Sequence, residues 1–169
     1  MTTITAAVAR TVPSPVGPLL LVGDGARLSG LFMTDQRHLP AIESSVEDPE
    51  AFADAAGQLA EWFAGERREF DLALAPTGTT FQREVWDVLR TIPFGKTMSY
   101  GEVGARVGRP GSARAVGAAV GRNPIGIVVP CHRVVGAGGA LTGYAGGLDR
   151  KLWLLEHERA VADPAQPLF

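Results

Sequence analysis

The stretch NPIGIVVPCHRVVGAGG, residues 123–139, contains the single cysteine of the chain, Cys131, directly before His132. An imidazole beside a thiol can stabilise or accept the thiol proton. This would lower the pKa of Cys131 below its ordinary value of about 8.5 and create a nucleophile. A lone cysteine is also commonly a buried structural residue. The pair therefore permits nucleophilic chemistry without establishing it.

A carboxylate that orients His132 would complete such a site, and Glu156 and Glu158 in the last predicted helix are the candidates. The β-branched residues 125–130 indicate a short buried strand that ends at Cys131. Consecutive side chains of a strand point to opposite faces. His132 can therefore reach the thiol only where the strand ends, or through a water molecule.

The composition is that of an ordinary globular protein, with 46% hydrophobic and 20% charged residues in 169. No apolar run approaches the ~18 residues of a membrane span, and the N-terminus lacks the pattern of a signal peptide. One cysteine cannot form an internal disulfide, which suits the cytoplasm. Three scattered histidines have no metal-ligand spacing, so we expect a cytoplasmic protein without a metal site.

The net charge of −2 hides a difference between the two halves. Residues 1–78 carry five basic and eleven acidic side chains, whereas residues 79–159 carry eleven basic and six acidic ones. Six of those basic residues lie within 96–133, where Glu102 is the one acidic residue. The asymmetry favours an anionic partner for the second half only, although a solvated charged face is the alternative.

The first half predicts a small α+β domain. Residues 18–24 and 27–34 read as a hairpin, and residues 35–49 as a loop. Apolar residues at helical spacing predict a helix over 49–66, with Gly65 as its stop. Residues 70–80 look like a strand that leads into a linker near 75–79.

The second half predicts helices. A threonine cap and an apolar stripe within 79–95 indicate a helix that stops before Pro93. The final helix, 148–160, places Leu148, Leu152, Leu155 and Arg159 roughly along one side. Between them, helices near 99–107 and 112–121 flank the turn GRPG, which is the outline of a helix-turn-helix. The small residues of the second of these suit either tight packing in a core or close entry into a nucleic-acid groove.

Three further side chains have two interpretations each. Tyr100 and Tyr144 lie near glycine-rich turns, where each is either a core ring or a site residue. Arg114, among the alanines of the second helix, is either a solvated surface charge or a nucleic-acid contact. The residues alone leave these alternatives open.

The motif PCHRV at 130–134, preceded by GRNPIGIVV and followed by GYAGGLDRKLWLLEHE, resembles the O6-alkylguanine-DNA alkyltransferase family. The resemblance covers about 79–159 and extends more loosely to SPVGPLLLVGD and LAEWFAGE. It implies an α+β fold: a small N-terminal antiparallel-sheet and helix domain of ribonuclease-H type (1–76), then a mainly helical, winged-helix-like DNA-binding domain with the active site (79–160), and a tail (161–169).

The resemblance also implies direct repair of double-stranded DNA. The protein would bind the minor groove, rotate an O6-alkylated guanine out of the stack and accept its alkyl group on Cys131. O4-alkylthymine is a further substrate that the sequence leaves open. One turnover per molecule, no cofactor and a monomer in solution are expected, and cooperative binding along DNA is left open.

Roles follow for individual positions that match the family. His132 would act as a general base through water, Glu158 would orient it, and Asn123 would form the hinge between recognition helix and active site. Arg114 would replace the flipped base, and Ala115, Gly117, Ala118 and Gly121 would complete the DNA-contacting helix. The remaining residues would contact the guanine: the Tyr100 side chain, the carbonyls of Cys131 and Val134, the ring of Tyr144, and the N–H of Ala145, where some relatives have serine.

Other functions fit parts of this pattern. Non-catalytic sensors of alkyl lesions resemble this family but lack the acceptor cysteine, which is present here. A thiol hydrolase could use Cys131 and His132 but has no need of a helix-turn-helix, and a transcription regulator could carry the cysteine incidentally.

Overall fold

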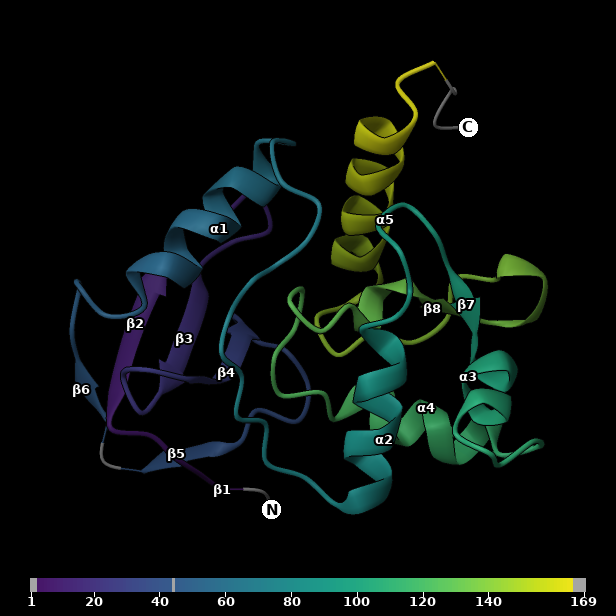
Figure 1. Ribbon diagram of the computed structural model, residues 1–169, viewed down its shortest axis with the longest axis horizontal. Helices are drawn as coiled ribbons and strands as arrows, with labels where there is room; N and C mark the ends of the chain where they lie inside the picture. Colours follow the sequence, from purple (N-terminus) through teal and green to yellow (C-terminus); the bar gives the residue numbers. More distant parts are fainter. Residues whose placement is uncertain (1–2, 44, 166–169) are drawn as a thin grey trace. The chain divides into compact units, whose positions relative to one another are not determined.

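The computed structural model describes residues 3–43 and 45–165, and it divides the chain into two compact units (Figure 1). The first unit is the chain up to Thr77 together with Pro124–Val128, and the second is Gly78–Asn123 and the chain from Val129 onward. A small sheet unit and a mainly helical one confirm the expected fold class. The return of Pro124–Val128 to the first unit was not expected from the sequence.

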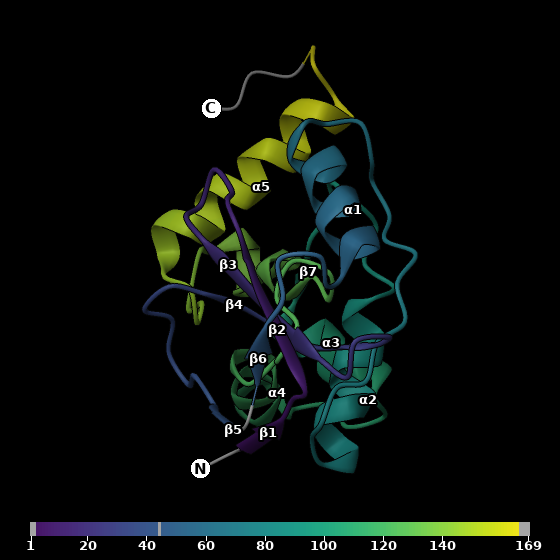
Figure 2. The ribbon, with the colours of Figure 1, turned by 90° about the vertical axis from the view of Figure 1, so that its left-hand side faces the viewer.

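A four-stranded sheet forms the centre of the first unit, in the order β4–β3–β2–β6 (Figure 2). Its members are β2 (Val8–Val12), β3 (Leu19–Gly23), β4 (Leu28–Met33) and β6 (Val46–Glu47). The predicted hairpin is confirmed as the antiparallel pair β3–β4, with Leu19 opposite Met33. Strand β3 alternates between two buried faces, so Leu19 and Leu21 lie on one side of the sheet and Val22 on the other.

Two expectations for the first unit were wrong. Residues 35–49 are not only loop, because β5 (Ala41–Glu43) pairs with β1 (Thr3–Thr5) and β6 pairs with β2, both in parallel. Residues 70–76 form no strand, only an isolated bridge between Leu28 and Leu74. Strands of two or three residues are too short to show an alternating pattern, so only their distant partners define them.

Helix α1 (Ala53–Phe63) is shorter than the predicted 49–66. It begins after Phe52, whose φ of 53° is left-handed and breaks the helical path. Its buried face is Ala55, Leu59 and Trp62, and Gly65, at φ 79°, ends it as predicted.

The segment expected as a strand over 125–130 has another structure. Its first residues lie on the outer edge of β4, where the Leu31 N–H donates to the Pro124 carbonyl (2.9 Å) and the Gly126 N–H donates to the Leu31 carbonyl (3.2 Å). Ile127 then takes a φ of 69° within a tight γ-turn, closed by the Val128 N–H and the Gly126 carbonyl (2.8 Å). An apolar run cannot distinguish this path from a strand, because both bury their side chains.

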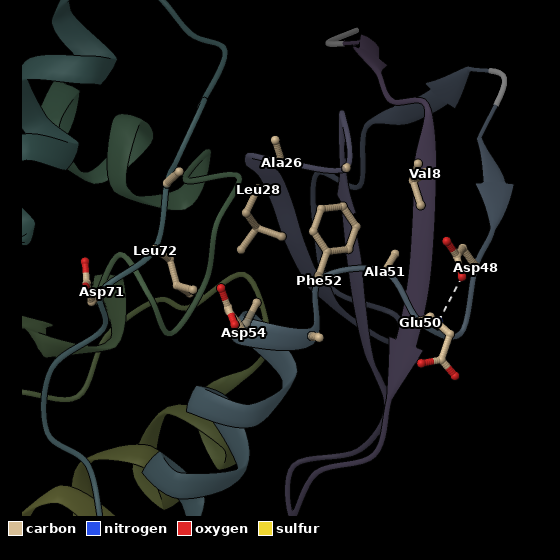
Figure 3. Close-up of a pocket in the computed structure, with 14 residues that line it drawn as sticks. Val8, Ala26, Leu28, Asp48, Glu50, Ala51, Phe52, Asp54, Asp71 and Leu72 are labelled. Atoms are coloured by element: carbon tan, nitrogen blue, oxygen red, sulfur yellow. Dashed lines mark hydrogen bonds between the residues drawn. The ribbon is translucent and has the colours of Figure 1, made fainter.

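A cavity of about 510 Å³ lies within the first unit, beside the start of α1 (Figure 3). Val8, Leu28 and Phe52 supply apolar lining. Four acidic residues also line it: Asp48, Glu50, Asp54 and Asp71. Carboxylates repel phosphates, so this cavity is no candidate for a nucleic-acid site.

Helices α2 (Thr80–Leu89), α3 (Tyr100–Arg106) and α4 (Ala113–Gly121) form the body of the second unit. Thr79 and Ser99 begin α2 and α3 with capping boxes, each completed by a Gln or Glu three residues later. The indole N–H of Trp86 in α2 donates to the Ala119 carbonyl in α4 at 2.9 Å, which ties these two helices together.

The predicted helix-turn-helix is confirmed as α3 and α4. Gly108 and Gly111 turn the chain between them with positive φ values of 76° and 78°. The helices approach closely at Gly104, where a Cβ atom would lie 2.9 Å from the Ser112 hydroxyl. Val103 and Val116 are fully buried.

The rest of the second unit consists of short elements and the last helix. Strands β7 (Met98–Ser99) and β8 (Val134–Val135) pair in parallel. The 3₁₀ turn η1 (Cys131–Arg133) directly precedes β8, and a second one, η2 (Ala137–Gly139), follows it. Helix α5 (Leu148–Ala162) includes the first residues of the expected tail, of which 166–169 lie outside the described residues.

The buried side of α5 is not the predicted one. Leu148 and Leu152 are exposed, whereas Lys151, Leu154 and Glu158 are buried. The buried set has the i, i+3, i+7 spacing of a helix face, but two of its members are charged, so a search for apolar residues passes over it. None of the helices in the described part of the chain is long and apolar enough to cross a membrane.

Two glycines of the first unit should respond to alanine in opposite ways. Gly57 is exposed within α1 and has open space at its Cβ position, so Gly57→Ala should raise the free energy of unfolding by about 0.5–1 kcal/mol. A Cβ on Gly30 would lie 2.4 Å from the buried Phe32 ring, so Gly30→Ala should lower the free energy of unfolding by about 1–3 kcal/mol. Urea denaturation measures both, and equal effects would contradict this packing.

Candidate active site around Cys131

Cys131 is the first residue of the 3₁₀ turn η1, not the last residue of a strand. The Cys131 N–H donates to the Val129 carbonyl at 2.8 Å, which closes an inverse γ-turn around Pro130 (φ −81°, ψ 65°). The side chain is 6% exposed. The turn therefore holds the thiol beneath the surface of the second unit.

Three groups surround the thiol. The Asn123 side chain and the Tyr144 hydroxyl hydrogen-bond with it, and the Lys151 ammonium is the nearby cation. Asn123 is itself fixed, because its Nδ2 donates to the Val129 carbonyl at 2.8 Å. Burial raises the pKa of Cys131, although Asn123, Lys151 and Tyr144 oppose this. The expectation that His132 lowers this pKa was wrong for the resting protein, because desolvation dominates and the Nε2 of His132 is bound to Glu158 and not to the thiol.

The Nε2 of His132 lies 2.7 Å from Oε1 of Glu158 on α5. The same carboxylate accepts from Arg133, whose Nε lies 2.9 Å from Oε1 and 3.0 Å from Oε2 and whose Nη2 lies 2.7 Å from Oε1. The backbone N–H of Gly95 donates to Oε2 at 3.2 Å. All three side chains are buried, at 0% for His132, 6% for Arg133 and 1% for Glu158.

The charges of Glu158 and Arg133, together with burial, define the protonation state of His132. Burial alone would raise the pKa of Glu158, but its bonds to His132 and Arg133 lower it to about 2, so it is a carboxylate at neutral pH. Burial lowers the pKa of His132 despite the pull of Glu158, so the imidazole is neutral there. A neutral ring that faces a carboxylate carries its proton on Nε2, which leaves Nδ1 as the basic nitrogen.

Lys151 fixes the segment that follows η2. Its fully buried ammonium donates to the carbonyls of Val134 (2.6 Å), Thr142 (2.8 Å) and Gly143 (3.0 Å). Burial lowers the pKa of Lys151 to about 8. The Tyr100 hydroxyl donates to the same Thr142 carbonyl at 3.3 Å. These bonds hold the segment that carries Tyr144 and Ala145 against the start of β8.

The structure therefore brings most of the predicted site residues together. Asn123 and Tyr144 contact the thiol of Cys131. His132 hydrogen-bonds with Glu158, and Glu156 is therefore not the carboxylate that binds the histidine. Val134 is buried with its carbonyl bound to Lys151, and Ala145 is half-buried in the neighbouring segment.

The predicted DNA-contacting residues form a separate group on α4. Arg114, Ala115 and Ala118 are exposed, and Gly117 and Gly121 are half-buried. A Cβ on Gly121 would meet open space, and one on Gly117 would only touch the Tyr100 ring at 3.8 Å. This face of α4 therefore presents a smooth backbone with one arginine.

Sequence reasoning missed Arg133 and Lys151. Both are buried charged residues whose partners are not adjacent in sequence: those of Arg133 are Ile92 and Glu158, and those of Lys151 include Val134. The spacing of Lys151, Leu154 and Glu158 was the signal that could have found the lysine. Among the described residues, no group of three or more His, Cys, Asp or Glu side chains could hold a metal ion.

Comparison with protein families gives two matches that together span most of the chain. Residues 8–76 match the ribonuclease-like domain of 6-O-methylguanine DNA methyltransferase, and residues 80–160 match the DNA binding domain of the same family.

Individual relatives agree with these matches. A methylated-DNA–protein-cysteine methyltransferase of Mycolicibacterium paratuberculosis is 54% identical over 160 residues, which is 95% of this chain and 97% of the relative. One from Methanosarcina acetivorans is 51% identical over 146 residues, 86% of this chain and 94% of the relative. The crystal structure of Mycobacterium tuberculosis OGT in complex with DNA superposes with a TM-score of 0.90 at 51% identity, covering 94% of both chains.

The buried carboxylate makes a specific prediction for acid stability. The pKa of Glu158 is about 2 in the folded protein against 4.5 ordinarily, so its contribution is complete above pH 4.5 and is lost as the pH falls towards 2. The difference corresponds to about 3 kcal/mol. Denaturant titrations at pH 7 to 2 should show this loss in the wild type and not in Glu158→Gln; parallel pH profiles of the two proteins would contradict it.

Proposed function

Because the chain belongs to the 6-O-methylguanine DNA methyltransferase family, we propose that it repairs double-stranded DNA by transferring the alkyl group of an O6-alkylguanine to Cys131. The observation that carries the proposal is the surroundings of the one cysteine in the sequence. Cys131 is buried among Asn123, Tyr144 and Lys151, next to a histidine whose Nε2 is bound by a carboxylate.

The reaction is a single displacement. The thiol proton passes through a water molecule to Nδ1 of His132, and the sulfur attacks the alkyl carbon bonded to O6 of the guanine. The S–C bond forms as the O6–C bond breaks, and O6 keeps the bonding electron pair. The proton is returned to the guanine, which leaves as the normal base, and Cys131 becomes a thioether. The atoms balance without a cofactor.

DNA binding falls to α4. The small residues of its outer face, Ala115, Gly117, Ala118 and Gly121, allow close approach to the minor groove, where bulky side chains would clash. Arg114 projects from this face and would fill the space left by the flipped nucleotide. Extrusion of a damaged base costs only a few kcal/mol because its pairing is already weak.

The extruded base would enter the pocket beside the thiol. Tyr144 would line it, the Ala145 N–H would stabilise O6, and the carbonyls of Cys131 and Val134 would accept from the guanine amine. Lys151 uses one lone pair of the Val134 carbonyl, and a second remains for the base. The Tyr100 side chain would contact the guanine edge and the neighbouring phosphate.

We expect each molecule to react once, because a thioether has no easy route back to a thiol. The protein would act as a monomer in the cytoplasm, where a reducing environment preserves the thiol.

A duplex oligonucleotide with one O6-methylguanine, labelled in the methyl group, tests the proposal. Incubated with an excess of this duplex, the protein should reach a plateau of about one methyl group per molecule, on the peptide that contains Cys131 by mass spectrometry, since the thioether does not turn over. Cys131→Ser should transfer none and still bind the duplex.

Other outcomes identify the rival functions. Binding of the lesion without transfer would make the protein a sensor, and repeated turnover would make it a hydrolase. Binding that ignores the lesion would favour a regulator, and label on Cys131→Ser would refute the acceptor assignment.

Arg114→Ala should slow transfer from duplex DNA by about tenfold to a hundredfold, because nothing would hold the base pair open. The rate with the free O6-alkylguanine base should not change, since the thiol and its network are intact. Arg83→Ala, which removes one exposed positive charge from α2 in the same unit, is the matched control. Equal rates for the two variants on duplex DNA would contradict the role of Arg114.

A further inference from the structure

We propose that Arg133 is a positioning residue that keeps the Glu158–His132 pair at a single proton, held on Nε2, and thereby leaves Nδ1 of His132 as the base for Cys131. The inference rests on the proposed function and extends it to a residue outside the thiol's immediate surroundings. It follows from the geometry of one buried carboxylate shared by two donors.

Every nitrogen of the Arg133 guanidinium has a defined partner. Nε and Nη2 donate to Glu158, and Nη1 donates to the Ile92 carbonyl at 2.7 Å. The guanidinium also lies 5.7 Å from the centre of the Phe94 ring. Arg133 is thereby bound both to α5 and to the segment after α2.

Arg133 and His132 share one oxygen atom. Oε1 of Glu158 is 2.7 Å from Nε2 of His132 and 2.7 Å from Nη2 of Arg133. An arginine does not lose its proton in a protein, so it presents a permanent positive charge to this oxygen. The carboxylate is therefore compensated before His132 takes part, and the imidazole can remain neutral.

Without Arg133 the protonation state of the Glu158–His132 pair should change. A carboxylate that is 1% exposed, with only a neutral imidazole and the Gly95 N–H as partners, carries an uncompensated charge and would recruit a second proton. That proton would reside on His132 as an imidazolium or on Glu158 as a carboxylic acid. An imidazolium has no basic nitrogen, and a neutral imidazole that faces a carboxylic acid is a weaker base than one that faces a carboxylate. In both cases a higher pH is needed to restore Nδ1 to its full basicity.

The other charged groups around His132 come from two elements. Glu158 and Lys151 act on it from α5, and Arg133 acts on it from η1. Lys151 and Arg133 both oppose protonation of the imidazole, and Glu158 favours it. Lys151 donates to three carbonyls and not to Glu158, so Arg133 is the cation that compensates this carboxylate directly.

The test is the pH dependence of single-turnover methyl transfer from the O6-methylguanine duplex, for wild type, Arg133→Gln and Arg133→Lys. Glutamine removes the charge but can still donate a hydrogen bond to Glu158, whereas lysine retains the charge. For Arg133→Gln the acidic limb of the rate profile should move to higher pH by about one unit, which is a tenfold loss of rate on that limb. The loss should be largely recovered at alkaline pH.

Two further variants test whether Arg133 acts through Glu158. In Arg133→Lys the acidic limb of the rate profile should stay at its wild-type pH, even where the rate is lower at every pH. In Glu158→Gln, adding Arg133→Gln should leave the limb in place, because the charge to be compensated is absent. Circular dichroism and affinity for the lesion duplex report folding independently of transfer.

The outcomes separate the two proposals. Wild-type protein that transfers no methyl group to Cys131 refutes the proposed function. Wild-type transfer combined with an Arg133→Gln rate lowered by the same factor at every pH refutes only the role of Arg133 and makes it structural. If Arg133→Gln does not fold, Arg133→Lys decides: a limb at the wild-type position supports the proposal, and a shifted limb overturns it.

Discussion

The buried carboxylate of Glu158 holds together the polar network of the second unit. It binds the residue beside the thiol, a neighbouring arginine and the backbone of Gly95, and it does so with almost no access to water. An isolated charge in such a place would be very costly, and the ion pair with Arg133 offsets this cost. Through Ile92 the same pair also joins the last helix to the segment that follows α2.

The thiol itself is organised by a different set of contacts. Polar groups from three segments, Asn123, Tyr144 and Lys151, approach it, while two tight turns set the course of the backbone before it. A deeply buried thiol remains protonated at rest, which protects it from oxidation and from adventitious electrophiles.

Local patterns in the sequence predicted most of the elements but not the long-range contacts. The β3–β4 hairpin, the capped helix α2 and the helix-turn-helix carry strong local signals, and all were found. The strand expected over 125–130 was wrong, since an apolar run does not reveal a residue such as Ile127 with left-handed backbone. The buried face of α5 was misassigned because its members Lys151 and Glu158 are hidden only by partners far along the chain. Resemblance to a family supplied the site residues that no spacing could establish.

The path of Pro124–Val128 has a consequence for how this protein can be divided. The chain leaves the second unit just after α4, adds Ile125 and Ile127 to the interior of the first unit, and returns two residues before Cys131. A fragment cut at the linker near Gly78 would leave these two isoleucines without the core that covers them. The first unit is therefore completed by residues that lie within the second half of the sequence, and a single cut of the chain cannot divide the protein into its two units.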